Sequence, residues 1–230
     1  MTVALRCADV RVRYGGIEVL HGIGLAVPFG AVTALVGLNG AGKSTLLDWC
    51  AGAASTATFA DGRLALAQAA DDRTLLDATG WSATRRAAHG LRLVPSGMNV
   101  FPGLSVGDNL RVTGDPGAAL ELFPELDPLQ SRRAATLSGG QRQLLAVAGA
   151  LSGNWRVLLV DEPVQGIAPA LAGRVYEALA AAVTPARAVL VADPVASRAA
   201  RIADFVWHLE RGHIAFAGES AEFTARFSAQ

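Results

Sequence analysis

The amino-acid sequence predicts an α/β fold with a mostly parallel sheet, and two observations support this prediction. The first is a set of apolar runs of the kind found in strands that are buried on both faces. These runs cover residues 31–36, 157–160 and 188–191. The second observation is that segments with helical character separate the runs along the chain. Strands that alternate with helices favour a parallel sheet with helices packed on its faces.

The remaining elements follow in a regular order. Residues 2–14 alternate between apolar and polar side chains, which predicts a strand with one buried face. Further short strands are expected at residues 23–27, 91–94, 205–209 and 213–216. The last two predict a closing hairpin around Arg211 and Gly212. Helices are expected over about residues 43–50, 140–151, 170–183 and 195–202.

Two segments lack a clear periodic pattern. Residues 53–90 are rich in alanine, and no element is assigned to them. Residues 97–133 are rich in glycine, proline and aspartate, which predicts several short helices in an inserted helical region. The sequence contains no internal repeat and no heptad pattern, so repeat folds and coiled coils are not expected.

The composition excludes some classes of protein. The chain has 230 residues, of which 51% are hydrophobic, and this is enough for one sizeable domain with a buried core. The formal net charge is +0 and no basic stripe is present, so no nucleic-acid partner is expected. The two cysteines, Cys7 and Cys50, are too few for a disulfide framework and predict reduced thiols in a cytosolic protein.

The N-terminal part of the sequence also bears on the membrane question. Met1 leads directly into a strand pattern, so no signal peptide is expected. Residues 19–42 carry no Asp, Glu, Lys or Arg, and this length is enough for a membrane span. Pro28, Asn39 and several glycines interrupt the stretch, so we interpret it as two strands and a loop. Any membrane association is therefore expected to come through a partner.

A glycine-rich motif lies between the predicted strand 31–36 and the helix that follows it. It matches the pattern G-x-x-x-x-G-K-[ST] and consists of Gly37, Leu38, Asn39, Gly40, Ala41, Gly42, Lys43, Ser44 and Thr45. Its glycines let backbone N–H groups point at phosphates, and the helix N-terminus adds a favourable dipole. We expect Lys43, the only lysine in the sequence, to reach the terminal phosphates and Ser44 to bind Mg²⁺. An incidental glycine turn is the alternative, and the strand–loop–helix setting argues against it.

A pair of acids follows the apolar run 157–160. Asp161 and Glu162 come directly after a buried strand, at the edge where ligands collect in open α/β sheets. We expect Asp161 to hold Mg²⁺ through water, and Glu162 to orient or deprotonate the attacking water. Many strands end in surface acids, so the pair alone is weak evidence. Together with the phosphate-binding motif it predicts nucleotide hydrolysis.

A third motif, Leu137-Ser138-Gly139-Gly140-Gln141, precedes the acid pair and opens a predicted helix. A serine cap followed by glycines can present backbone N–H groups to an anion, although a simple helix cap has the same pattern. With the two other motifs, this segment resembles the signature of the ABC ATPase family, and the resemblance covers essentially the whole chain. It implies a head-to-tail dimer with ATP between the phosphate loop of one subunit and the signature of the other. The residues that this implies for the signature are Ser138, Gly139, Gly140 and Gln141.

The resemblance also implies a fold. A single ABC ATP-binding domain over residues 1–230 would contain a P-loop NTPase core, an N-terminal antiparallel β subdomain and an inserted helical subdomain at about 97–150. Tyr14 matches the position of an aromatic ring that stacks on adenine in this family, and a tyrosine in the core remains the alternative. Residues 97–110 and 166–169 are similar to those of the ATP-binding subunits of branched-chain amino acid importers.

Three positions depart from the family pattern. Ser96 stands where the family usually has a glutamine, and Val164 where it usually has a serine. Asp193 aligns with the position of a switch histidine or glutamine near the γ-phosphate. A carboxylate that faces the γ-phosphate repels it unless it is protonated or bridged by a metal. These departures lead to the hypothesis that this subunit's own site binds ATP but hydrolyses it slowly, while its signature completes a more active site on a different partner.

We therefore expect the ATPase subunit of a membrane ABC transporter, bound peripherally at the cytoplasmic face of the membrane. The expected ligands are ATP and Mg²⁺. The expected partners are a second ABC ATPase subunit, identical or different, and an integral membrane permease. The subfamily resemblance implies import of branched-chain amino acids or related small polar solutes. Two alternatives are a nucleotide-binding regulatory subunit with weak or no hydrolysis, and a soluble ABC protein that acts on DNA or ribosomes. The latter proteins carry coiled coils, tandem domains or basic arms, which this sequence lacks.

Overall fold

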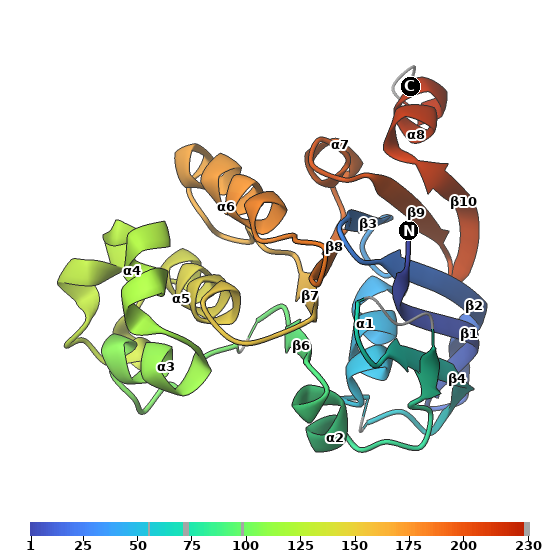
Figure 1. Cartoon of the computed structure of the whole chain (residues 1–230), viewed down its shortest axis with the longest axis horizontal. Helices are drawn as coiled ribbons and strands as arrows, with labels where there is room; N and C mark the ends of the chain where they lie inside the picture. Colours follow the sequence, from blue (N-terminus) through green and yellow to red (C-terminus); the bar gives the residue numbers. More distant parts are fainter. Residues whose placement is uncertain (55, 71–73, 98, 228–230) are drawn as a thin grey trace.

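Two β-sheets with helices packed around them form the structure (Figure 1), a computed structural model that describes residues 1–54, 56–70, 74–97 and 99–227. The strands are β1 (Val3–Tyr14), β2 (Ile17–Pro28), β3 (Val32–Val36), β4 (Phe59–Ala67), β5 (Leu75–Asp77), β6 (Leu91–Val94), β7 (Val157–Asp161), β8 (Ala188–Asp193), β9 (Phe205–Glu210) and β10 (His213–Glu219). The α-helices are α1 (Lys43–Ala51), α2 (Ala83–Ala88), α3 (Val106–Thr113), α4 (Pro116–Leu122), α5 (Gly139–Leu151), α6 (Pro169–Ala181), α7 (Ala196–Ala200) and α8 (Ser220–Phe227). Two 3₁₀ turns complete the set, η1 (Pro124–Leu129) and η2 (Ala134–Thr136).

The larger sheet has six strands in the order β10-β9-β3-β8-β7-β6. β9, β3, β8, β7 and β6 run parallel, and β10 closes the sheet as an antiparallel hairpin with β9. Every residue of β3, β7 and β8 is buried, which explains why these strands are continuous apolar runs rather than alternating ones. This topology confirms the predicted α/β fold with a mostly parallel sheet.

The register of the parallel strands brings their carboxyl ends together. Val36 at the end of β3 pairs with Asp193 at the end of β8. Asp161 at the end of β7 pairs with Ala192, the residue before Asp193. The phosphate-binding motif, the acid pair and the predicted switch residue therefore leave the sheet along one edge.

The smaller sheet is antiparallel, with the strand order β2-β1-β4-β5. β1 and β2 form a hairpin through Gly15 and Gly16, both with positive φ, so β2 begins earlier than the strand predicted at residues 23–27. The unassigned segment 53–90 supplies β4, β5 and α2. The buried side chains of this sheet form a core with α1, which follows the phosphate-binding motif.

Cys7 and Cys50 meet in this second core. Cys7 lies on β1 and Cys50 on α1, and both are buried free cysteines. The hydrogen-bonded Cys7 thiol, together with burial, raises the pKa of the Cys50 thiol well above its ordinary value. A buried thiol that remains protonated is unreactive, and the absence of a Cys7–Cys50 disulfide agrees with the predicted reduced state.

The helices α3, α4 and α5 gather at one end of the molecule, and the antiparallel sheet lies at the other end (Figure 1). Most of α5 is buried against the main core, whereas its first residues are exposed or half-exposed. The bounds of the inserted helical subdomain, at about residues 97 and 150, remain a prediction. Met98, within the stretch 97–110, lies outside the described residues. In the described part of the chain, no helix is long and apolar enough to cross a membrane. The uncharged stretch 19–42 instead forms parts of β2, β3 and the loop after β3.

Candidate nucleotide site

The phosphate loop, residues 37–45, is held in place by close backbone packing. A Cβ atom at Gly37 would lie 2.2 Å from the carbonyl oxygen of Leu209, and one at Gly42 would lie 2.7 Å from a methyl carbon of Leu20. Gly42 also has φ +109°, a conformation that side chains strongly disfavour. Glycine is therefore required at both positions by the protein's own packing.

Lys43 begins α1 and is only 4% exposed. Its Nζ donates hydrogen bonds to the carbonyl oxygens of Gly37 and Leu38, at 2.7 and 3.1 Å, so the side chain folds back over the loop. Burial lowers the pKa of Lys43, and the nearby carboxylates of Glu162, Asp161 and Asp193 oppose this effect. The single lysine thus lies among three acids that come from two neighbouring strands.

An open pocket of about 390 Å³ lies over the loop and the start of α1. It is lined by Val19, Asn39, Gly40, Gly42, Lys43, Ser44, Thr45 and Glu162. Ser44 is exposed, and no side chain caps the N-terminus of α1, which leaves the positive end of the helix facing the pocket. These features suit an anion such as a phosphate chain.

Asp161 has the environment expected of a residue that holds a cation. It is 2% exposed, and its Oδ1 atom is buried without a hydrogen-bond partner among the described residues. Burial and then Asp161 raise the pKa of Asp48 on α1, which places the Asp161 carboxylate near this helix. A buried carboxylate oxygen without a partner is costly, so it calls for a water or a metal ion.

Glu162 has an unusual backbone conformation for a residue other than glycine, with φ +48°. Its N–H donates to the carbonyl of Ala192 at 2.9 Å, and its Oε2 accepts from the side-chain amide of Gln165 at 2.9 Å. Burial and the adjacent Asp161 carboxylate raise the pKa of Glu162, while Lys43 lowers it. A raised pKa brings a carboxylate closer to the range that suits a general base.

Asp193 does not extend into the phosphate pocket. Its Oδ2 accepts a hydrogen bond from the Tyr176 hydroxyl on α6, and its Oδ1 accepts the Val195 N–H at 2.6 Å. The residue is 2% exposed, and burial followed by the Asp193 contact raises the pKa of Tyr176. Pro194, which follows, has no N–H group. The end of β8 therefore presents a carboxylate, which accepts hydrogen bonds, at the position where a histidine or glutamine could donate one.

Ser96 lies in the loop after β6 and is half-buried. No hydrogen bond joins its hydroxyl to another described residue, but Asn99 in the same loop contacts Gln143 on α5. Tyr14 lies at the end of β1, half-buried against the core of the antiparallel sheet, and it does not line the phosphate pocket. Its role as an adenine platform remains a prediction.

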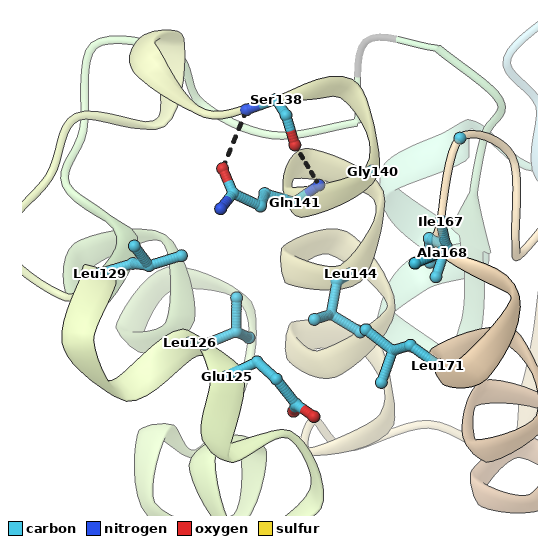
Figure 2. Close-up of a pocket in the computed structure, with 11 residues that line it drawn as sticks. Glu125, Leu126, Leu129, Ser138, Gly140, Gln141, Leu144, Ile167, Ala168 and Leu171 are labelled. Atoms are coloured by element: carbon cyan, nitrogen blue, oxygen red, sulfur yellow. Dashed lines mark hydrogen bonds between the residues drawn. The ribbon is translucent and has the colours of Figure 1, made fainter.

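The signature, residues 138–141, forms the N-terminus of α5 (Figure 2). The Gln141 N–H donates to Ser138 Oγ at 3.2 Å, and the Ser138 N–H donates to Gln141 Oε1 at 3.0 Å. This reciprocal capping box satisfies two backbone donors. A Cβ atom at Gly140 would lie 2.2 Å from the carbonyl oxygen of Gly166, whereas one at Gly139 would meet nothing within 4 Å.

A pocket of about 240 Å³ adjoins the signature. Its lining comes from η1, the start of α5, the segment before α6 and the first turn of α6, and it includes Leu126, Leu129, Leu144, Ile167 and Leu171. It shares no lining residue with the phosphate pocket, and none of its lining comes from the loop 37–45. One copy of the chain thus presents its phosphate loop and its signature at two separate places.

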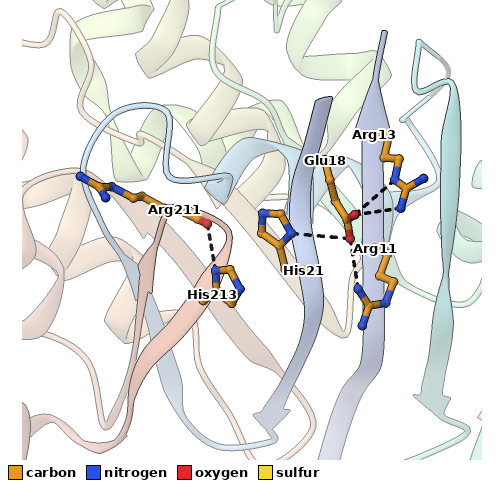
Figure 3. Close-up of polar contacts among 6 residues, drawn as sticks. All are labelled: Arg11, Arg13, Glu18, His21, Arg211 and His213. Carbon is orange, nitrogen blue, oxygen red and sulfur yellow. Dashed lines mark hydrogen bonds and ion pairs between the residues drawn. The ribbon is translucent and has the colours of Figure 1, made fainter. Parts of the chain in front are cut away.

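Two contacts of the site have no signal in the sequence. One is the chain of side-chain amides from Asn99 through Gln143 to Glu162. The other is the tip of the β9–β10 hairpin, where the Gly212 N–H donates to the Ala41 carbonyl and the His21 N–H donates to the Gly212 carbonyl, both at 3.0 Å. Beside this tip, the rings of His21 and His213 stack with centroids 4.5 Å apart, and Glu18 binds His21, Arg11 and Arg13 (Figure 3).

Comparisons with known proteins place the chain in a family. The family model described as "ABC transporter" matches residues 20–165. The chain is 32% identical over 214 residues to the high-affinity branched-chain amino acid transport ATP-binding protein BraG of Pseudomonas aeruginosa, which covers 87% of this chain and 86% of that protein. It is also 32% identical over 240 residues to the nickel import ATP-binding protein NikO of Rhodobacter capsulatus, covering 98% and 93%.

Solved structures show the same fold. A nucleotide-free ATP-binding cassette from an ABC transporter superposes with a TM-score of 0.81 at 22% identity, covering 100% of this chain and 96% of that chain. A cassette in its ADP conformation superposes with a TM-score of 0.78 at 22% identity, with the same coverage. These likenesses confirm the predicted fold class, a P-loop core with a second, antiparallel sheet.

Proposed function

Because this chain belongs to the ABC transporter family, as an ATP-binding subunit that hydrolyses ATP, we propose that it drives an integral membrane permease from the cytoplasmic face of the membrane. The observation that carries this proposal is the separation of the phosphate pocket from the exposed signature in a single copy. A signature that contacts ATP therefore needs the phosphate loop of another subunit. A head-to-tail pair of ATPase subunits, identical or different, supplies it.

The residues of the phosphate pocket fit ATP with Mg²⁺. Backbone N–H groups of residues 38–45 and the N-terminus of α1 would hold the phosphates, and Lys43 would neutralise part of their charge. Ser44 and Asp161 would hold Mg²⁺, consistent with the unpartnered Asp161 Oδ1. The ion supplies charge neutralisation at the transferred phosphoryl group.

Glu162 would act on the attacking water. Its carboxylate reaches the phosphate pocket, and its raised pKa makes it a stronger base than an ordinary glutamate. Gln165 restrains the carboxylate through a hydrogen bond to Oε2. In the proposed dimer, the partner's signature would cover the nucleotide and exclude bulk water, which strengthens every electrostatic contact inside.

Slow turnover at this subunit's own site is also part of the proposal, for a reason that differs from simple repulsion. The Asp193 carboxylate accepts hydrogen bonds from the Tyr176 hydroxyl and the Val195 N–H. Its negative charge is therefore not directed at the γ-phosphate. The site instead has a short serine hydroxyl at residue 96, where the family has a longer glutamine amide, and at the end of β8 it has a carboxylate, which accepts hydrogen bonds and does not donate them. Fewer donors to the transferred phosphoryl group mean less stabilisation of the transition state.

The transported solute is proposed from the relatives. BraG of Pseudomonas aeruginosa and LivF of Archaeoglobus fulgidus are described as branched-chain amino acid transport ATP-binding proteins, and both share 32% identity with this chain. We propose import of branched-chain amino acids or related small polar solutes. Relatives described as importing nickel and phosphonates share similar identity, so the permease decides this point.

The test is to purify the tagged chain with the proteins that accompany it and to compare ATP turnover between wild type and Glu162→Gln. Co-purification with a permease supports the transporter assignment, and its absence at native expression contradicts it. Turnover that collapses in the variant assigns the base to Glu162 and overturns the slow-site proposal. Turnover that barely changes supports a subunit that binds nucleotide and donates its signature to a partner, which is the regulatory alternative.

A further inference from the structure

Glu162 holds a strained conformation that its neighbours must maintain. Its φ of +48° lies in the left-handed region, which a residue with a side chain avoids unless its surroundings fix it. The N–H side is fixed by the carbonyl of Ala192. The carbonyl side accepts two hydrogen bonds, from the Gln165 N–H at 3.1 Å and from the side-chain Nε2 of Gln143 at 3.2 Å.

Gln143 reaches Glu162 from a different part of the molecule. It lies on α5, is 3% exposed, and is five positions beyond the cap residue Ser138. Its Oε1 accepts a hydrogen bond from the Asn99 side-chain amide, and the same Asn99 nitrogen donates to the Pro95 carbonyl at 3.4 Å. One buried amide therefore joins the loop after β6, the signature helix and the backbone of Glu162.

The chemistry of this link makes it sensitive to movement. A glutamine that is buried and bonded at both ends loses both hydrogen bonds if α5 shifts relative to β7, and each unmade bond is costly in a buried setting. The Glu162 carbonyl would then keep only the Gln165 N–H, a contact within its own turn. Gln143 supplies the hydrogen bond to the Glu162 carbonyl that comes from outside this turn.

We propose that Gln143 is a positioning residue that makes the geometry of Glu162 depend on the position of the signature helix. The proposal rests on the proposed function, in which Ser138 contacts the partner's nucleotide and Glu162 acts on the nucleotide of its own phosphate loop. Gln143 then connects the two nucleotides of the dimer inside one subunit. Asn99 extends the link to the loop that carries Ser96, at the position where this chain lacks the family's glutamine.

The first test compares Gln143→Leu with Asn109→Leu in the purified complex. Asn109 is a matched control: it is 2% exposed, its amide forms hydrogen bonds with the loop at Phe101 and Ser105, and none of its hydrogen bonds in the described structure goes to Glu162. Where Glu162→Gln lowers turnover of the complex, Gln143→Leu should lower kcat about tenfold with KM for ATP within about twofold, because misplacement of a catalytic group acts mainly on the chemical step. Asn109→Leu should lower the melting temperature and leave kcat per folded complex unchanged. Equal kcat losses in both variants would contradict the proposal.

The second test shows whether Gln143 acts through Glu162. In a Glu162→Gln background, Gln143→Leu should have no further effect on kcat, because the group that it positions is gone. An additional tenfold loss in that background would assign Gln143 another role. A conservative Gln143→Glu variant keeps the acceptor for Asn99 and removes the donor to Glu162, so it should behave as Gln143→Leu does.

A third measurement separates failure of this proposal from failure of the proposed function. If Glu162→Gln leaves turnover unchanged, kcat no longer reports on Glu162, but amide hydrogen exchange still does. Gln143→Leu should speed exchange of the Glu162 and Gln165 amides at least threefold relative to wild type and to Asn109→Leu. Unchanged exchange at these amides would show that Gln143 does not hold this turn, whatever the role of Glu162.

Discussion

The phosphate loop and the signature would bind the same ligand from opposite sides, yet the chain builds them in opposite ways. The base of the loop is fixed by its own subunit: Gly37 lies against the Leu209 backbone, and Lys43 is 4% exposed. The signature is open, with Ser138 and Gly139 exposed at the start of a capped helix. The shape of the loop therefore depends on its own chain, whereas the signature is an exposed surface that becomes part of a nucleotide site only with a partner.

The largest effect is expected at Gly37. In Gly37→Ala, the new Cβ meets the Leu209 carbonyl oxygen at 2.2 Å, and the nearest side-chain atom is the Cβ of Ala41, so no flexible side chain can give way. We expect ATP affinity of the isolated subunit to fall at least about 100-fold, and unfolding free energy to fall by about 1–3 kcal/mol, the usual cost of overpacking. Fluorescent nucleotide binding and thermal unfolding measure both quantities. Gly173→Ala on α6, where a Cβ meets nothing within 4 Å, is the control: it should leave ATP affinity unchanged and raise the unfolding free energy by up to about 1 kcal/mol, because alanine is the better helix former.

A smaller and more selective effect is expected at Gly139. The Gly139→Asp side chain points into open space, and an acid in the first turn of α5 suits the helix dipole, so the subunit should fold and bind ATP as wild type does. Turnover of the complex should fall about tenfold, because the new charge faces the partner's nucleotide phosphates. Loss of ATP binding by the isolated variant would remove the contrast between the two regions.

The smallest effect is expected on stability at Glu162. Because burial raises the pKa of Glu162, the folded state binds this proton more tightly than the unfolded state, and stability falls as pH rises through the folded pKa. Glu162→Gln carries no charge, so its melting temperature should exceed that of wild type at pH 7 by a few degrees or less. The difference should shrink when both are measured below the ordinary glutamate pKa. An equal difference at both pH values would mean that charge burial is not its source.

The predictable parts of the fold and site are those that a short stretch of sequence determines. The runs in β3 and β7 are apolar because both faces are buried, and Gly37 and Gly42 are fixed by local backbone needs. The strands β4 and β5 were not predicted, since exposed alanine and aspartate positions hide their alternation and the pairing partner β1 is distant in sequence. Pairing between strands that are distant in sequence leaves no signal within a short stretch of residues.

The same distinction applies to the site. The carboxyl ends of β7 and β8 could be predicted, but the direction of the Asp193 side chain depends on Tyr176, a residue on a different helix. The Asn99–Gln143 contact joins the loop after β6 to α5, and a glutamine on a helix gives no sign of its partner. Side-chain hydrogen bonds across elements follow from the assembled fold, which the sequence pattern alone does not specify.

The hairpin tip at Gly212 has a consequence for the order of folding during synthesis. The Gly212 N–H donates to the phosphate loop at Ala41, and its carbonyl accepts the His21 N–H of β2, although Gly212 lies far beyond the loop in the sequence. A ribosome makes residues 37–45 long before it makes residue 212, so the loop emerges without the backbone that braces it. The nascent chain therefore gains a finished nucleotide pocket only after residue 212 has been made.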